Sequence, residues 1–223
     1  MTTLTATTNA TSPWAISADT TGTIVLQSNG ITAVTIDTSQ NASFAKSIIL
    51  SGSTSGTTTL ASTAVAGTST ATLPAATGTV MVSGNMPAFS VYKSNALGTQ
   101  IIAAATYTKI TFDVKDFDTN TNFSSSRFTP TVAGYYQING LADLGGNGFC
   151  FVGLFKNGAE IKRGSGASVA SEFYSSVSSV VYLNGTTDYI ELYAFINAGA
   201  SPSVYASASG QYPYFNGCLV RAA

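Results

Sequence analysis

Charged residues are distributed unevenly along this chain, and the unevenness limits what each part can fold into. The first 92 residues hold three charged side chains, Asp19, Asp37 and Lys46, and the remaining 131 hold sixteen. A segment that is poor in both charges and large apolar residues is neither a globular domain nor a highly charged disordered chain. We therefore expect the N-terminal part to be an extended β-structure rich in Thr, Ser, Ala and Gly.

Such a structure needs a core from identical neighbouring chains. Between residues 52 and 78 the large apolar residues are Leu60, Val65 and Leu73. A single chain cannot bury enough with these to offset an ordering entropy of ~1–2 kcal/mol per residue. Three chains wound around one axis would point the same apolar rows inward and pair their backbones between subunits. A flexible linker over 51–84 is the alternative, although β-branched Thr favours strands over a linker.

The same region has a rough rhythm of short strands and turns. Runs typical of strands are TGTIVLQ, GITAVTID, KSIILSG, GTTTLAS, TAVAG, TATLPA and GTVMVSG. Asn29-Gly30 and similar Gly-containing pairs separate them. We divide the chain into an attachment segment (1–20), a β-rich shaft (21–86) and a C-terminal head (87–223), with a hinge at Met86-Pro87.

The head has a different composition. Of the 12 phenylalanines 11 lie after residue 84, as do all 11 tyrosines. Apolar and polar residues alternate over 106–114, 134–144 and 188–196. Asn157-Gly158 and Asn184-Gly185 fall between such runs, where tight turns with positive φ favour Asn-Gly. The head is therefore predicted to be all-β, a sandwich or jelly roll of roughly eight to ten strands.

Composition argues against several functions. The net charge of −1 gives no electrostatic footprint for nucleic acid. No run of 18 apolar residues occurs, so we expect no membrane insertion. Histidine is absent, which removes the commonest general base and excludes a Ser-His-acid triad. We expect no enzyme and no cofactor, since the acids that a glycosidase would need, Glu160, Glu172 and Glu191, fall in different predicted elements.

Two smaller groups of residues leave alternatives open. Asp113, Asp116 and Asp118 could supply oxygens to calcium, but alternate strand residues more often form a solvated face, and we expect no metal site. Cys150 and Cys218 lie in apolar runs and are expected to be small buried residues. Whether they pair is left open.

The head resembles a known family. The run ITFDVKDFDTNTNFSSSRFTPTVAGYYQING, the hairpin VGLFKNGAEI, the pair of strands VVYLNGTTDYIELYAF and the closing strand YFNGCLVR are similar to the globular head of complement C1q-like proteins, within the tumour-necrosis-factor-like jelly rolls. The match covers roughly 88–221. Its positions are Phe112, Asp113, Asn122, Phe123, Phe128, Thr129, Pro130, Gly134, Tyr135, Tyr136, Asn157, Gly158, Phe215, Gly217 and Leu219.

The region before the head departs from that family, because it has no collagen Gly-X-Y period. GITAVTIDTSQNASF and the Thr-rich run after it instead resemble the shafts of bacteriophage tail fibres and virion fibres. The two resemblances together imply a bacteriophage virion protein that is assembled in the host bacterial cytoplasm. We expect a short homotrimeric fibre with a shaft followed by a jelly-roll head.

The resemblance also implies where partners bind. Trp14, the only tryptophan, stands alone in a polar tail, which indicates an anchor to other virion proteins; packing on its own shaft is the alternative. With the shaft and the C-terminus at one end of the head, the turns at 157–158 and 184–187 should lie there, and 116–123, 143–148, 165–172 and 197–212 at the far end. The residues expected to face a host glycan or protein receptor at that far end are Tyr205, Tyr212, Asn147 and Ser201, since Tyr, Ser and Asn are typical of recognition surfaces.

Other roles for the same chain fit the same features. The chain could be a capsid-decorating (head) fibre or a baseplate or collar protein without a dedicated ligand. A secreted adhesin is disfavoured by the N-terminal sequence, which has no basic and apolar signal pattern. In the head, Tyr135, Tyr136, Tyr193 and Phe195 are expected in the core or at a subunit contact.

Overall fold

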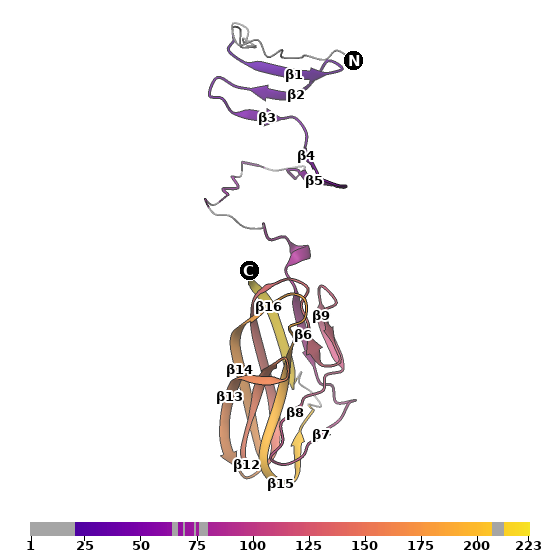
Figure 1. Cartoon of the computed structure of the whole chain (residues 1–223), viewed down its shortest axis with the longest axis vertical. Helices are drawn as coiled ribbons and strands as arrows, with labels where there is room; N and C mark the ends of the chain where they lie inside the picture. Colours follow the sequence, from indigo (N-terminus) through magenta and orange to yellow (C-terminus); the bar gives the residue numbers. More distant parts are fainter. Residues whose placement is uncertain (1–20, 64–66, 69, 74, 76–79, 207–211) are drawn as a thin grey trace. The chain divides into compact units, whose positions relative to one another are not determined.

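The computed structural model describes residues 21–223 except 64–66, 69, 74, 76–79 and 207–211 (Figure 1). The chain divides into two compact units, Met1–Ala75 and Ala76–Ala223. We call them the N-terminal unit and the head unit. Trp14 and the expected attachment segment lie outside the described residues. Within the described part of the chain, no helix is long and apolar enough to cross a membrane.

The N-terminal unit consists of hairpins that form within one chain. Its strands are β1 (Ile24–Ser28), β2 (Ile31–Ile36), β3 (Ala42–Phe44), β4 (Ile48–Ser51) and β5 (Thr57–Leu60). They form an antiparallel sheet in the order β1-β2-β3 and a separate β4-β5 pair. Within the single chain these strands pair with one another, and pairing between chains stays a prediction. The described residues of 61–82 form no strand, although three of the predicted runs lie there.

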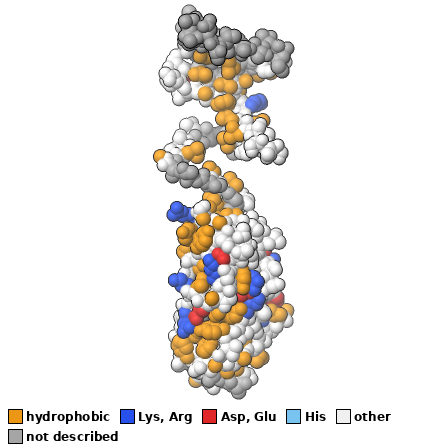
Figure 2. Space-filling model, viewed as in Figure 1, with side chains coloured by type: hydrophobic (Ala, Val, Ile, Leu, Met, Phe, Trp, Pro, Cys, Tyr) orange, Lys and Arg blue, Asp and Glu red, His pale blue; other side chains and the backbone are white. Residues whose placement is uncertain are grey.

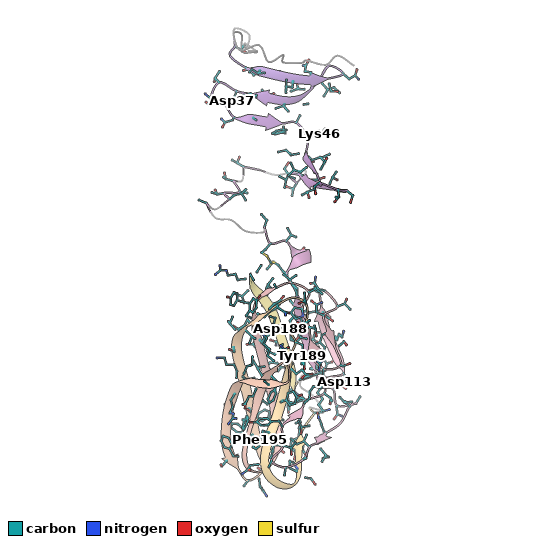
Figure 3. The ribbon with its side chains drawn as sticks, viewed as in Figure 1. Asp37, Lys46, Asp113, Asp188, Tyr189 and Phe195 are labelled. Carbon is teal, nitrogen blue, oxygen red and sulfur yellow. The ribbon has the colours of Figure 1, made fainter. Side chains whose placement is uncertain are left out.

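Turn residues explain why these hairpins form. Asn29 and Gly30 join β1 to β2 with φ of 51° and 72°, the left-handed conformation that this pair adopts readily. After β2, Asp37 Oδ1 accepts hydrogen bonds from the backbone N–H groups of Ser39 and Asn41, each at 2.9 Å. Because these devices are local, they set the register without a core. Figure 3 labels Asp37 at this turn.

The N-terminal unit has no interior in a single chain. Among its described residues none is buried, and Figure 2 shows hydrophobic side chains on its surface. The exposed large apolar residues are Val25, Leu26, Ile31, Phe44, Ile49, Leu50, Leu60 and Leu73. An isolated two-stranded hairpin is at best marginally stable in water.

The head unit is all-β apart from one short 3₁₀ helix, η1 (Ser83–Asn85). Its strands are β6 (Ala88–Tyr92), β7 (Gln100–Ile101), β8 (Thr108–Lys109), β9 (Val114–Asp118), β10 (Phe123–Ser124), β11 (Arg127–Phe128), β12 (Gly134–Lys156), β13 (Ala159–Val169), β14 (Glu172–Leu183), β15 (Ile190–Val204) and β16 (Tyr214–Ala222). All of them join one sheet with a main path β10-β11-β15-β12-β16-β6-β9.

Strand β12 belongs to two layers. Its first part, 134–145, pairs with β14 and β16, and its second part, 148–156, pairs with β13 and β15. The change occurs at a run of glycines in which Gly148 has φ +89°. The layers approach each other again where the hydroxyl of Ser175 on β14 donates to the carbonyl of Ser165 on β13 at 2.6 Å. The result is the nearly closed, two-layer jelly roll that the sequence predicted.

The core lies between the two layers. Phe89, Phe128 and Tyr136 are fully buried, and the rings of Phe89 and Phe128 stack with centroids 4.2 Å apart. The Tyr136 hydroxyl donates to the Val132 carbonyl at 2.6 Å, which satisfies its only polar group. Burying such a side chain contributes roughly 1.5–3 kcal/mol to the stability of the fold. The head unit therefore has a hydrophobic core, which the N-terminal unit lacks in a single chain.

The strand predicted over 106–114 is interrupted because this segment crosses between the layers. The Ile110 N–H donates to Leu192 on β15, whereas the Asp113 N–H donates to Tyr92 at the end of β6. The predicted turn at Asn157-Gly158 is confirmed, with φ of 53° and 84°. At the other predicted turn, Gly185 has φ +71°, and a Cβ there would lie 2.3 Å from the backbone nitrogen of Ala133.

The loops gather at two ends of the head unit. We call the end formed by 145–148, 170–172 and 201–205 the apical end, and the end formed by 132–134, 184–188 and the C-terminus the basal end. At the basal end the Ala223 N–H donates to Ala133, and the turn 157–158 joins it because Asn157 Nδ2 donates to Asp188 at 2.7 Å.

The prediction for 116–123 was wrong. The Thr119 N–H donates to the Ala88 carbonyl and Asn120 Nδ2 to the Gly84 carbonyl, each at 3.0 Å. Strand β9 runs antiparallel to β6, with Asp118 opposite Phe89, and its far end therefore returns to the start of β6. This loop lies at the basal end.

Candidate binding surfaces of the head unit

The apical end gathers three of the four residues predicted to face a receptor. Asn147, Ser201 and Tyr205 line one shallow hollow of about 200 Å³ together with Glu172 and backbone around Gly145. The Tyr205 N–H donates to the Asp143 carbonyl at 3.0 Å. A Cβ at position 145 would lie 2.2 Å from the Tyr205 ring, so this packing requires glycine there.

The fourth predicted residue, Tyr212, lies beside a residue that sequence reasoning missed. Its hydroxyl is 3.3 Å from the hydroxyl of Tyr174 on β14, with the ring centroids 5.5 Å apart. Tyr174 is the cross-strand partner of Asp143 on β12. The alternation over 134–144 could have placed Asp143 on an outer face, but nothing local indicates that Tyr174 and Glu172 lie next to it.

The apical end has an acidic character. Asp143 is buried, and its Oδ1 has no hydrogen-bond partner among the described residues. Burial raises the pKa of this carboxyl, and the negative charge of Glu172 raises it further. The hydrogen bond with Tyr212, together with the nearby charge of Asp143, raises the pKa of Tyr174 to about 12. Phenols and carboxylates of this kind suit a neutral, hydroxyl-rich ligand better than an anion.

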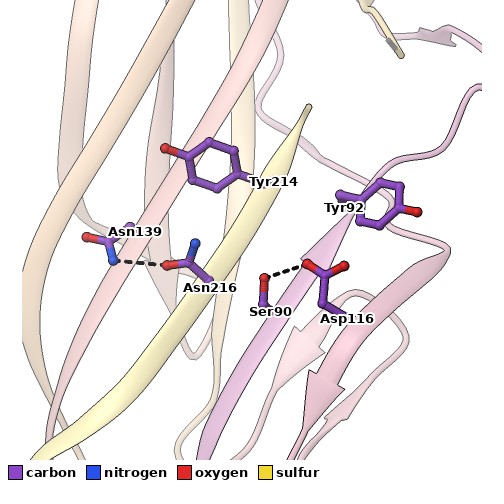
Figure 4. A pocket seen from close by; sticks show the side chains of 6 residues that line it. All are labelled: Ser90, Tyr92, Asp116, Asn139, Tyr214 and Asn216. Carbon is purple, nitrogen blue, oxygen red and sulfur yellow. Dashed lines mark hydrogen bonds between the residues drawn. The ribbon is translucent and has the colours of Figure 1, made fainter. Parts of the chain in front are cut away.

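A second surface is the outer face of the layer formed by β6, β16, β14 and residues 134–143 of β12. We call it the Asn139 face. At its centre Asn139 Nδ2 donates to Asn216 Oδ1 at 3.0 Å, and Ser178 Oγ donates to Asn139 Oδ1 at 2.8 Å. A pocket of about 300 Å³ opens beside this pair (Figure 4), lined by Ser90, Tyr92, Asp116, Asn139, Tyr214 and Asn216.

Apolar side chains flank the polar centre of the Asn139 face. Tyr135 and Tyr182 lie side by side with ring centroids 5.5 Å apart, and Val180 and Val220 are 52% and 61% exposed. The sequence did not separate Tyr135 from Tyr136. The pleat does, since Tyr136 points into the core and Tyr135 outward. A sheet face with exposed aromatic and β-branched residues is typical of a protein contact surface.

The outer face of the other layer is covered by its own aromatic rings. Phe155 stacks on Tyr193 with centroids 4.1 Å apart, and Phe151 stacks on Phe195 at 5.1 Å. Tyr107 packs against the same group. Tyr193 and Phe195, predicted to lie in the core or at a contact, therefore pack on the outside of the sandwich within the chain. Figure 3 labels Phe195.

The carboxylates considered for calcium do not converge. Asp113 accepts from the Ser94 N–H at 2.7 Å, Asp116 from the Ser90 hydroxyl at 2.9 Å, and Asp118 from the Asn122 N–H at 2.8 Å. The described residues contain no group of three or more His, Cys, Asp or Glu side chains that could hold a metal ion.

The acids considered for catalysis lie in separate clusters. Glu160 bonds to Arg163 at 2.8 Å, Glu191 lies between Lys109 and Arg127, and Glu172 belongs to the apical hollow. Glu160 and Glu191 are thus each paired with cationic side chains. Glu160, Glu172 and Glu191 therefore do not converge on one another.

The expectation for the two cysteines was half wrong. Cys150 is buried, as predicted, and its burial raises the pKa of its thiol. Cys218 is exposed on the Asn139 face, since the pleat of β16 turns it away from the core, and both thiols are free.

Comparisons with known proteins concern the fold only. No protein-family model matches the chain, and no curated protein matches it. Among solved structures, the globular domain of zebrafish complement 1qA protein is 20% identical, with a TM-score of 0.45, and the match covers 61% of this chain and 99% of that one. Murine APRIL is 10% identical, with a TM-score of 0.45 and coverage of 60% and 99%. Eiger TNF from S. frugiperda is 10% identical, with a TM-score of 0.47 and coverage of 62% and 95%. These are C1q and TNF-like jelly-roll domains, and the jelly-roll assignment of this chain rests on its own strand pairing.

Proposed function

We propose that this chain is a bacteriophage virion protein, a short homotrimeric fibre whose head binds the host cell surface. The observation that carries the proposal is the contrast between a head unit with a complete core and an N-terminal unit in which no described residue is buried. Strands that have good turns but no interior need other chains to cover them. Identical copies supply matching apolar rows at the same height along an axis.

The exposed side chains of the N-terminal unit favour this arrangement. Leu26 on β1, Ile49 and Leu50 on β4, and Leu60 on β5 are all about half exposed or more. Exposed apolar residues that recur on successive hairpins are unfavourable in a solitary chain. Covering each with another chain contributes roughly 1.5–3 kcal/mol per side chain.

In the head, the Asn139 face is the surface we propose for contact between subunits. Its apolar rim supplies area, and the amide pair Asn139–Asn216 supplies directional hydrogen bonds that fix one register. This assignment leaves the apical end, with Tyr205 and Tyr212, free to meet a receptor. The N-terminal segment would then attach to other virion proteins through Trp14.

Sedimentation of the full chain tests the assembly. We expect a single species with three times the mass of one chain, and protection of Cys218 from a thiol reagent in the native trimer. A folded monomer with slow hydrogen exchange across β1–β5 would overturn the fibre proposal.

Location and binding need a separate experiment. Electron microscopy of virions labelled on this protein is expected to place it on the tail, and purified trimer is expected to block adsorption of the phage. Label on the capsid, with no block at saturating trimer, would indicate instead the alternative, a capsid-decorating fibre.

A further inference from the structure

A polar pocket of the head unit lies away from the apical hollow, and two of its residues, Thr121 and Asn122, belong to the loop at the basal end. It has a volume of about 520 Å³ and is lined by Lys109, Thr121, Asn122, Ser124, Ser125, Arg127, Thr129 and Thr131. We call it the Arg127 pocket. Every lining side chain carries a hydrogen-bonding group, two are cations, and none is an acid. No sequence motif indicated it, because the loop between β9 and β12 folds back against β8 and β15 to form it.

One buried carboxylate holds both cations. Glu191 Oε1 accepts from Lys109 Nζ at 3.2 Å and from Arg127 Nε at 2.9 Å, and the Glu191 side chain is 2% exposed. A single negative charge cannot neutralise two positive charges, so the group keeps one excess positive charge. The nearby carboxylate Asp118 is already paired with Lys115 at 3.0 Å.

Arg127 is oriented and still has donors to offer. Its guanidinium carbon lies 3.6 Å from the centroid of the Tyr189 ring, and Figure 3 labels this tyrosine. Stacking on an aromatic ring fixes the plane of the guanidinium. Among the described residues nothing accepts from its two Nη groups, so their N–H donors stay available for a ligand.

The turn beside these cations is strained. Ser125 and Ser126 join β10 to β11 with φ of 51° and 56°, where an Asn-Gly pair would adopt the conformation more easily. A hydrogen bond holds Ser126 in this conformation, because its hydroxyl accepts from the Phe112 N–H at 2.9 Å. The carbonyl of Ser125 accepts from Lys109 Nζ at 3.0 Å. The strained turn thereby places a serine and a lysine at the same wall of the pocket.

We propose that the Arg127 pocket binds the carboxylate or phosphate group of an acidic glycan. The planar guanidinium recognises an oxyanion through two parallel hydrogen bonds. The hydroxyls of Thr129, Thr131 and Ser124 then match the hydroxyls of the sugar that carries it. The proposed function supplies only the source of such a glycan, the host surface; the chemistry of binding does not depend on it.

Other anions fit less well. A nucleic acid presents a long row of phosphates, whereas this pocket has one excess positive charge and the chain a net charge of −1. A purely structural ion cluster would account for Glu191 and its two partners. It would leave the ring of hydroxyls around a hollow of this size without a role.

Titration calorimetry on the full chain tests the proposal with three probes. Trigalacturonate carries carboxylates, mannose 6-phosphate carries a phosphate, and galactotriose is neutral. We expect binding of trigalacturonate, of mannose 6-phosphate, or of both, and binding that weakens as salt is added. Either anionic sugar binding alone supports the proposal and identifies the group recognised. Equal binding of galactotriose, or binding of none of the three, overturns it.

A matched pair of variants assigns the binding to this pocket. Arg127→Lys keeps the charge and the partner Glu191 but loses the planar fork, and we expect about tenfold weaker binding. Arg163→Lys is the control, because Arg163 also bonds to a glutamate and lies over a ring, Phe151 at 4.2 Å, outside the pocket. Unchanged binding by Arg127→Lys, or an equal loss in Arg163→Lys, would overturn the assignment.

A third variant and a sedimentation run separate the two proposals. Thr129→Val with Thr131→Val removes hydroxyls without touching the ion cluster, and weaker sugar binding with an unchanged melting temperature is expected. If it binds sugar as the parent chain does, the hydroxyls play no part and the proposed ligand class is wrong. The trimer proposal fails only on the mass measured by sedimentation, whichever result the sugars give.

Discussion

The two units of this chain are both built from β-strands, yet they are organised by different forces. In the N-terminal unit, turns specify the strands: Asn29-Gly30 and the Asp37 carboxylate set the hairpins, and no described residue is buried. In the head unit, Phe89 and Tyr136 are among many side chains that are fully buried. Local sequence can therefore define strands, but only large apolar residues that face each other define an independent domain.

Charges show the same difference. In the head unit, Lys156 Nζ lies 2.7 Å from Asp188 Oδ2, and both groups are largely buried. In the N-terminal unit, Asp37 is exposed and serves the turn alone. Tertiary structure brings Lys156 and Asp188 together, whereas the hydrogen-bond partners of Asp37 are its neighbours in sequence.

The strongest test of the contrast is a core substitution in the head. Phe89→Ala is expected to lower the free energy of unfolding by about 3–5 kcal/mol, because it removes a buried ring and leaves a cavity. Denaturant unfolding followed by fluorescence measures it. The control is Phe117→Ala, where the ring is 49% exposed and the loss should stay within about 0.5 kcal/mol. Equal losses would mean that the core is misplaced.

A substitution in the N-terminal unit could break the contrast. Ile49 is 63% exposed in one chain, so Ile49→Ser should have almost no effect on a monomer. If neighbouring chains cover Ile49, the substitution lowers the free energy of unfolding by about 1.5–3 kcal/mol per chain. Thermal melting at two protein concentrations distinguishes these outcomes, since dissociation makes the transition concentration-dependent. An unchanged, concentration-independent melt would leave the N-terminal unit without partners.

The Asp188 pair is a test within the head. The hydrogen bonds from Lys156 and Asn157 lower the pKa of Asp188 below its ordinary 3.8. Its stabilisation is therefore complete above that pH and is lost as the pH falls through the lower folded-state value. Asp188→Asn is expected to cost about 1–2 kcal/mol near neutral pH and nothing at strongly acid pH, as measured by unfolding across a pH series. If Asp188→Asn lowers the free energy of unfolding by the same amount down to strongly acid pH, the charge of Asp188 is not what stabilises the head.

Asp143 should behave in the opposite sense and with the smallest effect. Because burial and Glu172 raise the pKa of its carboxyl, charging it costs stability as the pH rises above the ordinary value of 3.8. Asp143→Asn is expected to stabilise the head by about 1 kcal/mol near neutral pH and to have no effect below that value. Loss of stability at neutral pH would show that the hydrogen bond with Tyr174, which favours the charged form, outweighs burial and Glu172.

Much of the head could be predicted because its signals are local. The alternation over 134–144 predicted a strand, which is the first part of β12, and Asn157-Gly158 predicted the turn with positive φ. The crossing of 108–118 between layers could not be predicted, since the hydrogen-bond partners of that segment, Leu192 and Tyr92, lie far away in sequence.

The candidate sites were predicted unevenly for the same reason. The three apical residues Asn147, Ser201 and Tyr205 were predicted to lie at one end of the head, and they do meet in one hollow. Lys109 and Arg127 lie close together because both pair with the buried carboxylate of Glu191 on β15. No pattern in the sequence marks such a convergence.

The pairing of β6 with β16 has a mechanical consequence. The two strands are antiparallel from Ala88 opposite Cys218 to Tyr92 opposite Tyr214, and the Leu219 N–H donates to the Pro87 carbonyl just before β6 begins. If the head binds a ligand at the apical end, as proposed, a pull between that ligand and the N-terminal end of β6 would act along these strands. It shears the whole row of backbone bonds together rather than peeling them apart singly, which is the geometry in which a sheet resists pulling best.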